Sequence, residues 1–189
     1  MKLSYNSPLI LSFALLAATI FLFDHYLSTK NITALYFSSP STFNVNSTLD
    51  YLRSFSYIFG HASWDHLAGN LMLILLIGPV LEEKYKFLSL GLMIMITAAA
   101  TSFLNMALFH SSLMGASGIA FMLIILSSFT NARADSVPLT FVLITLLFLT
   151  REIADAFLVK DSVSQFGHVF GGVLGGVFGF IFSKAKRTS

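Results

Sequence analysis

Long uninterrupted stretches of apolar residues constrain this chain more than any other feature of its sequence. Such runs cover residues 8–23, 66–81, 87–108 and 166–182. Hydrophobic residues make up 56% of the 189 residues and charged residues 11%, whereas soluble domains have about 45–50% and about 25%. A folded chain of this composition is surrounded largely by lipid rather than by water. The sequence therefore predicts an integral membrane protein that crosses the bilayer several times.

The apolar runs are continuous, which favours helices over a β-barrel, because barrel strands alternate apolar and polar residues over about 10 positions. Two further runs, residues 117–130 and 137–150, are too short to span the bilayer unaided. We therefore expect an all-α membrane protein of six helices, in which a short fourth helix is buried among the others. Residues 1–189 are expected to form a single domain, with residues 28–64 as a long first loop.

The distribution of Lys and Arg predicts the orientation, because cytoplasmic loops carry an excess of these residues. With six helices, both termini and the turns at residues 82–86 and 131–136 share one side, which carries Lys2, Lys84, Lys86, Arg133, Lys184, Lys186 and Arg187. The other side has Lys30, Arg53, Arg151 and Lys160, spread over longer loops. We expect both termini in the cytoplasm, the first loop outside it, and the cell (inner) membrane as the location.

The composition also excludes several functions. The chain has no cysteine, which rules out thiol catalysis, disulfides and cysteine-based metal sites. The net charge is +2 and basic residues do not cluster outside the chain ends, which argues against a nucleic-acid partner. No cofactor or metal is expected, and the lipid bilayer is the one partner that the composition requires.

Four polar side chains from three expected helices should lie at one depth near the outer surface. His66 and Asn70 are near the outer end of the second helix, Ser117 begins the fourth, and His168 is in the first turn of the sixth. Polar side chains in apolar helices are costly and tend to face the bundle interior. Each residue alone has an ordinary structural explanation, such as helix packing for a serine, but their convergence predicts a site.

The chemistry of these residues suits acyl transfer. A serine hydroxyl becomes nucleophilic when a neighbouring imidazole takes its proton, and neither helix offers a carboxylate at this depth, so a Ser117–His168 dyad is the simplest proposal. The start of the fourth helix, at Ser117 and Gly118, supplies unpaired N–H groups for an oxyanion. Asn70 and His66 are further donors, or form a hydrogen-bonded clasp between the second and fourth helices; the two roles are compatible.

Small residues should bring the serine and the histidine together. The sixth helix carries glycines four residues apart, a pattern that lets another backbone approach closely: Gly167, Gly171, Gly175 and Gly179. Gly115 and Gly118 would form the opposite surface. A serine side chain is short, so the two helices must nearly touch if His168 is to reach Ser117.

Together these residues resemble the rhomboid family of intramembrane serine proteases over about residues 50–180. The family's G-x-S-G motif corresponds to Gly115, Ser117 and Gly118. Its H-x-x-x-x-H-x-x-x-N motif corresponds to His61, His66 and Asn70. Its H-x-x-G-x-x-x-G motif corresponds to His168, Gly171 and Gly175, and Gly78 and Glu82 also fit.

The resemblance implies a six-helix rhomboid-like bundle that cleaves transmembrane protein substrates. Ser117 would be the nucleophile, His168 the base, and Asn70 with His66 the oxyanion donors. Phe121 occupies the place of an aromatic ring that packs on the catalytic histidine. Substrates would enter laterally, with residues 137–150 as gate and residues 106–114 as cap.

The chain departs from the family pattern at three places. Arg53 and Trp64 are separate, where many relatives carry a Trp-Arg pair. Lys86 stands four residues after Glu82, where a glycine is usual, and Gly167 stands where alanine is common.

Three other functions are compatible with parts of the sequence. A catalytically inactive relative that binds or escorts membrane proteins usually lacks the serine or the histidine, and both are present here. A small transporter is possible with six helices, but the sequence has no two-fold internal repeat. A metal site at His61, His66 and His168 has three imidazoles and no nearby carboxylate.

Overall fold

The computed structural model describes residues 4–129, 137, 139–158 and 162–185, and within these residues all regular structure is helical. The elements in chain order are α1 (Pro8–Tyr26), α2 (Ile32–Tyr36), α3 (Thr48–Ser56), the 3-10 turn η1 (Tyr57–Phe59), α4 (Trp64–Phe109), α5 (Ser117–Ser127), α6 (Leu139–Leu158) and α7 (Ser162–Ala185). The prediction of an all-α fold is confirmed for the described residues.

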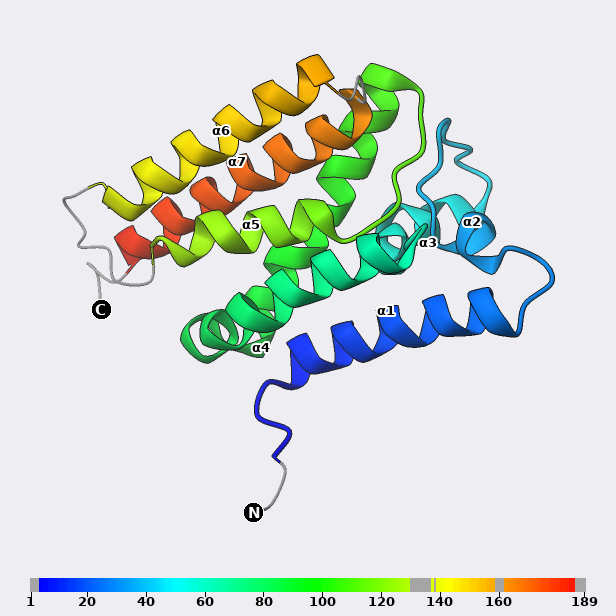
Figure 1. Ribbon diagram of the computed structural model, residues 1–189, viewed down its shortest axis with the longest axis horizontal. Coiled ribbons are helices and arrows are strands. Elements are labelled where there is room, and N and C mark those ends of the chain that lie inside the picture. Colours follow the sequence, from blue (N-terminus) through cyan, green and yellow to red (C-terminus); the bar gives the residue numbers. More distant parts are fainter. Residues whose placement is uncertain (1–3, 130–136, 138, 159–161, 186–189) are drawn as a thin grey trace.

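Three described segments are long and apolar enough to cross a membrane, judged by length and composition: Pro8–Tyr26, Trp64–Phe109 and Gln165–Phe182. They account for the longest apolar runs in the sequence. The 11-residue helix α5 is much shorter. It lies in the middle of the bundle between α4 and α7 (Figure 1), and its buried residues are spread around the helix.

Helix α4 is two helical arms that meet at Lys86. Its 46 residues are helical except for Lys86, whose backbone has φ 67° and ψ 161°. This conformation is adopted almost exclusively by glycine and costs another residue about 1–3 kcal/mol. The sequence predicted a short charged turn over residues 82–86; instead, the helix continues to Tyr85 and one residue reverses the chain.

Two other expected boundaries are wrong. The second apolar run begins at residue 66, but α4 begins at Trp64, because Ser63 caps its first turn with an Oγ that accepts the N–H of His66 at 3.2 Å. Asp65 lies inside the first turn, where a negative charge interacts favourably with the helix dipole. The fifth apolar run was expected to end at Thr150, but α6 continues to Leu158, because charged residues end an apolar run without ending a helix. The expected turn at residues 131–136 lies outside the described residues.

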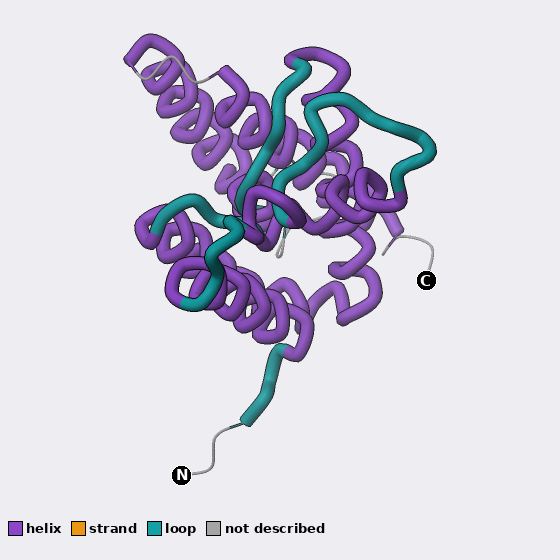
Figure 2. Tube along the Cα trace, turned by 90° about the vertical axis from the view of Figure 1, so that its right-hand side faces the viewer, coloured by secondary structure: helices purple, strands orange, loops and turns teal. Residues whose placement is uncertain are grey.

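The two ends of the bundle differ (Figure 1). The start of α1, the break in α4 and the ends of α5 and α7 lie at one end, on the left of the figure, while α2 and α3 lie at the other. Figure 2 views the molecule from the α2–α3 end, where most described loops gather. There the loop before α3 is joined to the loop before α5 by two hydrogen bonds between Ser39 and Leu113, of 2.7 and 2.8 Å.

Helix α1 packs along α4 through one polar contact and apolar side chains. The Glu82 carboxylate accepts the N–H groups of Leu9 and Ile10 at 2.9 and 3.0 Å. These are N–H groups of the first turn of α1, which have no partner within the helix. The fully buried side chain of Ile10 lies directly on Gly78. Gly78 and Glu82, which lie one helical turn apart in α4, thus both contact the start of α1.

Candidate active site

A cavity of about 340 Å³ lies at the start of α5, at the α2–α3 end of the bundle. Segments far apart in the sequence form its wall. The lining residues are Tyr57, His66, Thr101, Ser111, Ser112, Leu113, Met114, Gly115, Ser117, Gly118 and Gly167. The cavity therefore brings α4, the loop before α5, α5 itself and α7 together around Ser117.

Gly115 shapes one side of this cavity. Its φ of 117° is a conformation that suits glycine, and its N–H donates to the Tyr57 carbonyl at 3.0 Å. A Cβ at this position would lie 2.5 Å from Nε2 of His66 and 3.7 Å from Nδ2 of Asn70. The absence of a side chain at Gly115 lets both groups of α4 lie against the chain two residues before Ser117.

Asn70 presents a buried donor beside this loop. Its side chain is 7% exposed, and its Nδ2 has no hydrogen-bond partner among the described residues. A buried donor without a partner is unfavourable, so this amide is suited to binding an oxygen atom. Ser117 is the first residue of α5, and the first N–H groups of a helix also lack partners within it. Donors from two elements therefore lie near one point.

Helices α5 and α7 meet through their backbones. A Cβ on Gly171 would overlap the carbonyl oxygen of Gly118, and one on Gly175 would overlap that of Met122. A Cβ on Gly118 would lie 3.1 Å from the Gly167 carbonyl oxygen. Glycines at these positions allow a close approach that any side chain would prevent.

His168 follows Gly167 in α7 and lies on the serine side of α5. Its ring centroid is 4.6 Å from that of Phe121. Phe121 is four residues after Ser117, so both occupy the same face of α5. His168 is thus held against the α5 face that bears Ser117.

The cavity wall contains part of the predicted site. Ser117, Gly118 and His66 belong to the wall, while Asn70 and His168 do not. Asn70 lies beside the wall at Gly115, and His168 beside it at Gly167.

Tyr57 and Thr101 line the cavity but were not predicted to do so. Thr97, Thr101 and Asn105 recur every four residues along an apolar helix, and this polar stripe was a detectable signal. Tyr57 gave no such signal, because its place depends on contacts between distant segments. Its hydroxyl donates to the Ala98 carbonyl at 3.2 Å, and burial raises its pKa.

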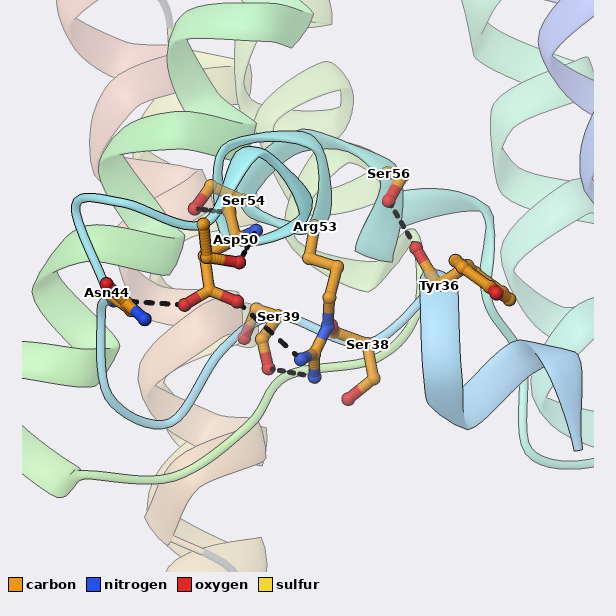
Figure 3. A network of polar contacts seen from close by, with 9 residues as sticks. Tyr36, Ser38, Ser39, Asn44, Asp50, Arg53, Ser54 and Ser56 are labelled. Atoms are coloured by element: carbon orange, nitrogen blue, oxygen red, sulfur yellow. Dashed lines mark hydrogen bonds and ion pairs between the residues drawn. The ribbon is translucent and has the colours of Figure 1, made fainter.

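A polar network centred on Arg53 supports the loop that carries Gly115 (Figure 3). Arg53 Nε donates to the Ser38 carbonyl at 2.7 Å, and its NH2 group donates to that of Ser39 at 3.4 Å. Asp50 lies 3.9 Å from Arg53 in an ion pair. Because Ser39 is bonded in turn to Leu113, this arginine anchors the chain leading to the cavity, although it is not paired with a tryptophan in the sequence.

His61 lies behind His66 rather than in the cavity wall. It is 2% exposed, its Nδ1 is 3.2 Å from the Phe59 carbonyl oxygen, and its ring centroid is 5.0 Å from that of His66. Burial and then the charge of His66 lower the pKa of His61 to about 4. Among the described residues, no group of three or more His, Asp or Glu has the arrangement of a metal site.

The comparison with protein families decides the identity of this fold. The model of the rhomboid domain matches residues 48–185. The chain belongs to the rhomboid family. The match covers α3 to α7 and confirms the resemblance seen in the sequence. Rhomboid proteins are in general intramembrane serine proteases. A comparison with curated proteins found no match.

Proposed function

We propose that this rhomboid protein is an intramembrane serine endopeptidase with a Ser117–His168 dyad. The observation that carries the proposal is the position of the start of α5: Gly115 of its entry loop lies against His66 and Asn70 of α4, and Phe121 lies against His168 of α7. Residues that three separate motifs contribute are therefore gathered around one serine.

The proposed reaction uses these groups in order. Ser117 Oγ attacks the carbonyl carbon of the scissile peptide bond while His168 takes the hydroxyl proton. The oxyanion binds the Asn70 amide, the His66 ring and the N–H of Gly118. His168 then gives its proton to the leaving amine, which departs and leaves an acyl-enzyme. Water from the cavity hydrolyses the acyl-enzyme and restores the free hydroxyl.

Substrates of this reaction are transmembrane proteins. We propose lateral entry from the bilayer past α6, which lies at the edge of the bundle along α7 (Figure 1), beneath a cap formed by the loop between α4 and α5. A transmembrane helix hides its carbonyls in internal hydrogen bonds, so it must unwind locally before attack. Substrates with Gly or Pro near the cleavage site should therefore be cleaved faster than their poly-Leu versions.

The membrane topology is part of the proposal. Counting the arms of α4 separately gives six membrane helices, with α5 as the short fourth, in a single domain of residues 1–189. An even number of crossings agrees with the start of α1 and the end of α7 at the same end of the bundle. The Lys and Arg distribution then places that end in the cytoplasm and residues 28–64 outside, in the cell (inner) membrane.

Labelling with a fluorophosphonate probe tests the dyad. The wild type should react, Ser117→Ala should not, and His168→Gln should react far more slowly.

Asn70→Ala should lower kcat for a single-span substrate about 10²–10³-fold, the usual effect of removing one oxyanion donor. Ser112→Ala is the matched control, since it removes a hydroxyl from the same cavity wall. A wild type that binds substrate but never reacts would identify the chain as an inactive relative.

The absence of native cysteine makes the orientation directly testable. A membrane-impermeant maleimide should label Lys30→Cys in intact cells. It should label Lys86→Cys only after the cells are lysed. The reverse pattern would overturn the proposed orientation and leave the dyad untouched.

A further inference from the structure

An apolar groove of about 380 Å³ runs between α1 and the second arm of α4, away from the candidate active site. Among the described residues that line it, Ser12 alone has a polar side chain. Its walls include Leu9, Phe13 and Leu16 of α1, and Phe87, Leu88 and Met95 of α4. The floor at the far end is Ile58 and Phe59 of η1.

The shape of the groove suits one hydrocarbon chain. Gly91 lines the groove without a side chain of its own, and a Cβ there would be in ordinary van der Waals contact with the methyl groups of Leu9, at 3.8 and 3.9 Å. From Phe87 to Met95 the helix rises about 12 Å, which matches several methylene groups of an acyl chain. Leu88 and Leu92 on the rim are 74% and 62% exposed, as expected for side chains that face lipid.

Lys86 lies at one end of this groove, directly before Phe87. Its side chain is exposed, and it makes no hydrogen bond or ion pair with any described residue. The other charges of the turn are placed differently. Glu82 binds the start of α1, and Lys84 donates to the Phe129 carbonyl at 2.7 Å. Glu83 is exposed but stands four residues before Phe87, the first residue of α4 that lines the groove, whereas Lys86 stands directly before it.

Lys86 has a positive φ of 67°, a backbone conformation that glycine would adopt without strain. The chain instead carries a strained lysine next to Phe87 of the groove, and no described residue pairs with its charge. Strain of this kind persists only where the surrounding structure fixes the residue, and strained residues cluster at functional sites such as ligand clamps. A cation beside hydrocarbon at the end of a membrane helix matches the chemistry of a phospholipid, with phosphate and acyl chain joined.

We propose that the groove between α1 and α4 binds one acyl chain of an anionic phospholipid, whose phosphate is held by Lys86. A lysine near the membrane surface attracts anionic lipid, and the groove adds van der Waals contact with the chain. The site depends on membrane insertion and not on the proposed proteolysis. Occupancy would fill the space beside α1 and strengthen its attachment to α4.

Native mass spectrometry of the detergent-solubilised protein tests the charge. Phosphatidylglycerol and phosphatidylcholine with identical acyl chains are added separately, and the wild type should retain the first roughly five-fold more strongly. Lys86→Gly should bind both equally and Lys86→Arg should keep the preference. Lys30→Gly, in the loop beyond the other end of α1, should behave as the wild type. An unchanged preference in Lys86→Gly would overturn the proposal.

A second variant tests the groove independently. Gly91→Leu places a side chain in the space assigned to the acyl chain, so retention of both lipids should fall together. Gly69→Leu is the control, because no atom lies within 4 Å of a Cβ at Gly69 and the site is on the other arm of α4. Thermal unfolding checks that each variant is folded. A folded Gly91→Leu protein that retains both lipids as the wild type does would contradict the acyl-chain site.

Discussion

The contact between α5 and α7 is made by backbones, whereas the contact between α1 and α4 is made by side chains. On the α7 side, Gly171 and Gly175 lie directly against carbonyl oxygens of α5. On the α1 side, Glu82 and apolar side chains hold α1, and a groove of about 380 Å³ remains between the helices. The two interfaces belong to one bundle but differ in how closely the helix backbones approach each other.

The difference follows from what each interface must position. If Ser117 and His168 exchange a proton, their helices have to be fixed to within a few tenths of an ångström, and backbone contact leaves no room for adjustment. Helix α1 carries none of the proposed catalytic groups, so its position can vary without affecting them. Flexible side chains, a polar cap and a space that lipid can fill are sufficient there.

Adding one methyl group to the backbone interface should have the largest effect. Gly171→Ala places a Cβ on the Gly118 carbonyl oxygen, and backbone cannot shift cheaply, so we expect a loss of about 3 kcal/mol or more and no fluorophosphonate labelling. Gly176→Ala, on the same helix, meets only side chains of Phe141 and Ile125, at 3.7 and 3.9 Å, and should lose neither stability nor labelling. Equal stability of the two variants would show that the helices are not in close contact.

Removing the cap of α1 should reduce stability by less and spare the chemistry. Glu82→Ala leaves the N–H groups of Leu9 and Ile10 without their acceptor, at an expected cost of about 2–3 kcal/mol. Thermal unfolding in detergent measures the loss, and fluorophosphonate labelling below the melting temperature should persist. Glu83→Ala is the control, since this neighbouring carboxylate is exposed. If Glu82→Ala abolished labelling in the folded protein, the two interfaces would be coupled.

The features that could be predicted from the sequence are those encoded locally. Continuous apolar runs identified the long helices, and a serine among small residues marked the start of α5. The spacing of four in Gly167, Gly171 and Gly175 indicated a close helix contact, because one helical face repeats at that interval.

The features that could not be predicted depend on contacts between distant segments. Tyr57 joins the cavity wall because its carbonyl accepts the N–H of Gly115 and its hydroxyl donates to Ala98. The charged residues 82–86 indicated a turn but not that Lys86 alone would reverse the chain, since Glu, Lys and Tyr are all compatible with a helix. The role of Arg53 is likewise visible once Ser38 and Ser39 are placed beside it.

Acid should weaken the α1 side before the α5–α7 contact. Burial and the charge of His66 lower the pKa of His61 to about 4, against about 6.5 in the unfolded chain. As the pH falls below about 6.5, the unfolded chain therefore gains a proton that the folded chain does not, and stability decreases by on the order of 2 kcal/mol at pH 5. His61 lines a cavity of about 200 Å³ together with residues of α1, so its protonation affects this side of the molecule rather than the α5–α7 contact.

Comparing unfolding at pH 7 and pH 5 for the wild type and His61→Gln isolates this contribution. The variant should lose less stability on acidification, and the difference should level off below about pH 4, where both states of the wild type are protonated. His110→Gln controls for an exposed histidine in the loop after α4. An identical pH dependence in His61→Gln would mean that another group controls the acid response.

The smallest effect should come from a glycine that neither interface uses. Gly69 lies in the first arm of α4 with no atom within 4 Å of a Cβ built on it. Gly69→Ala should therefore stabilise the helix by about 0.5–1 kcal/mol, because alanine loses less conformational freedom on folding than glycine. If Gly69→Ala raises the free energy of unfolding while Gly171→Ala lowers it, the backbone contact with α5 requires glycine in α7, and helix propensity does not. If Gly69→Ala lowers the free energy of unfolding as much as Gly171→Ala does, the backbone contact is not the reason.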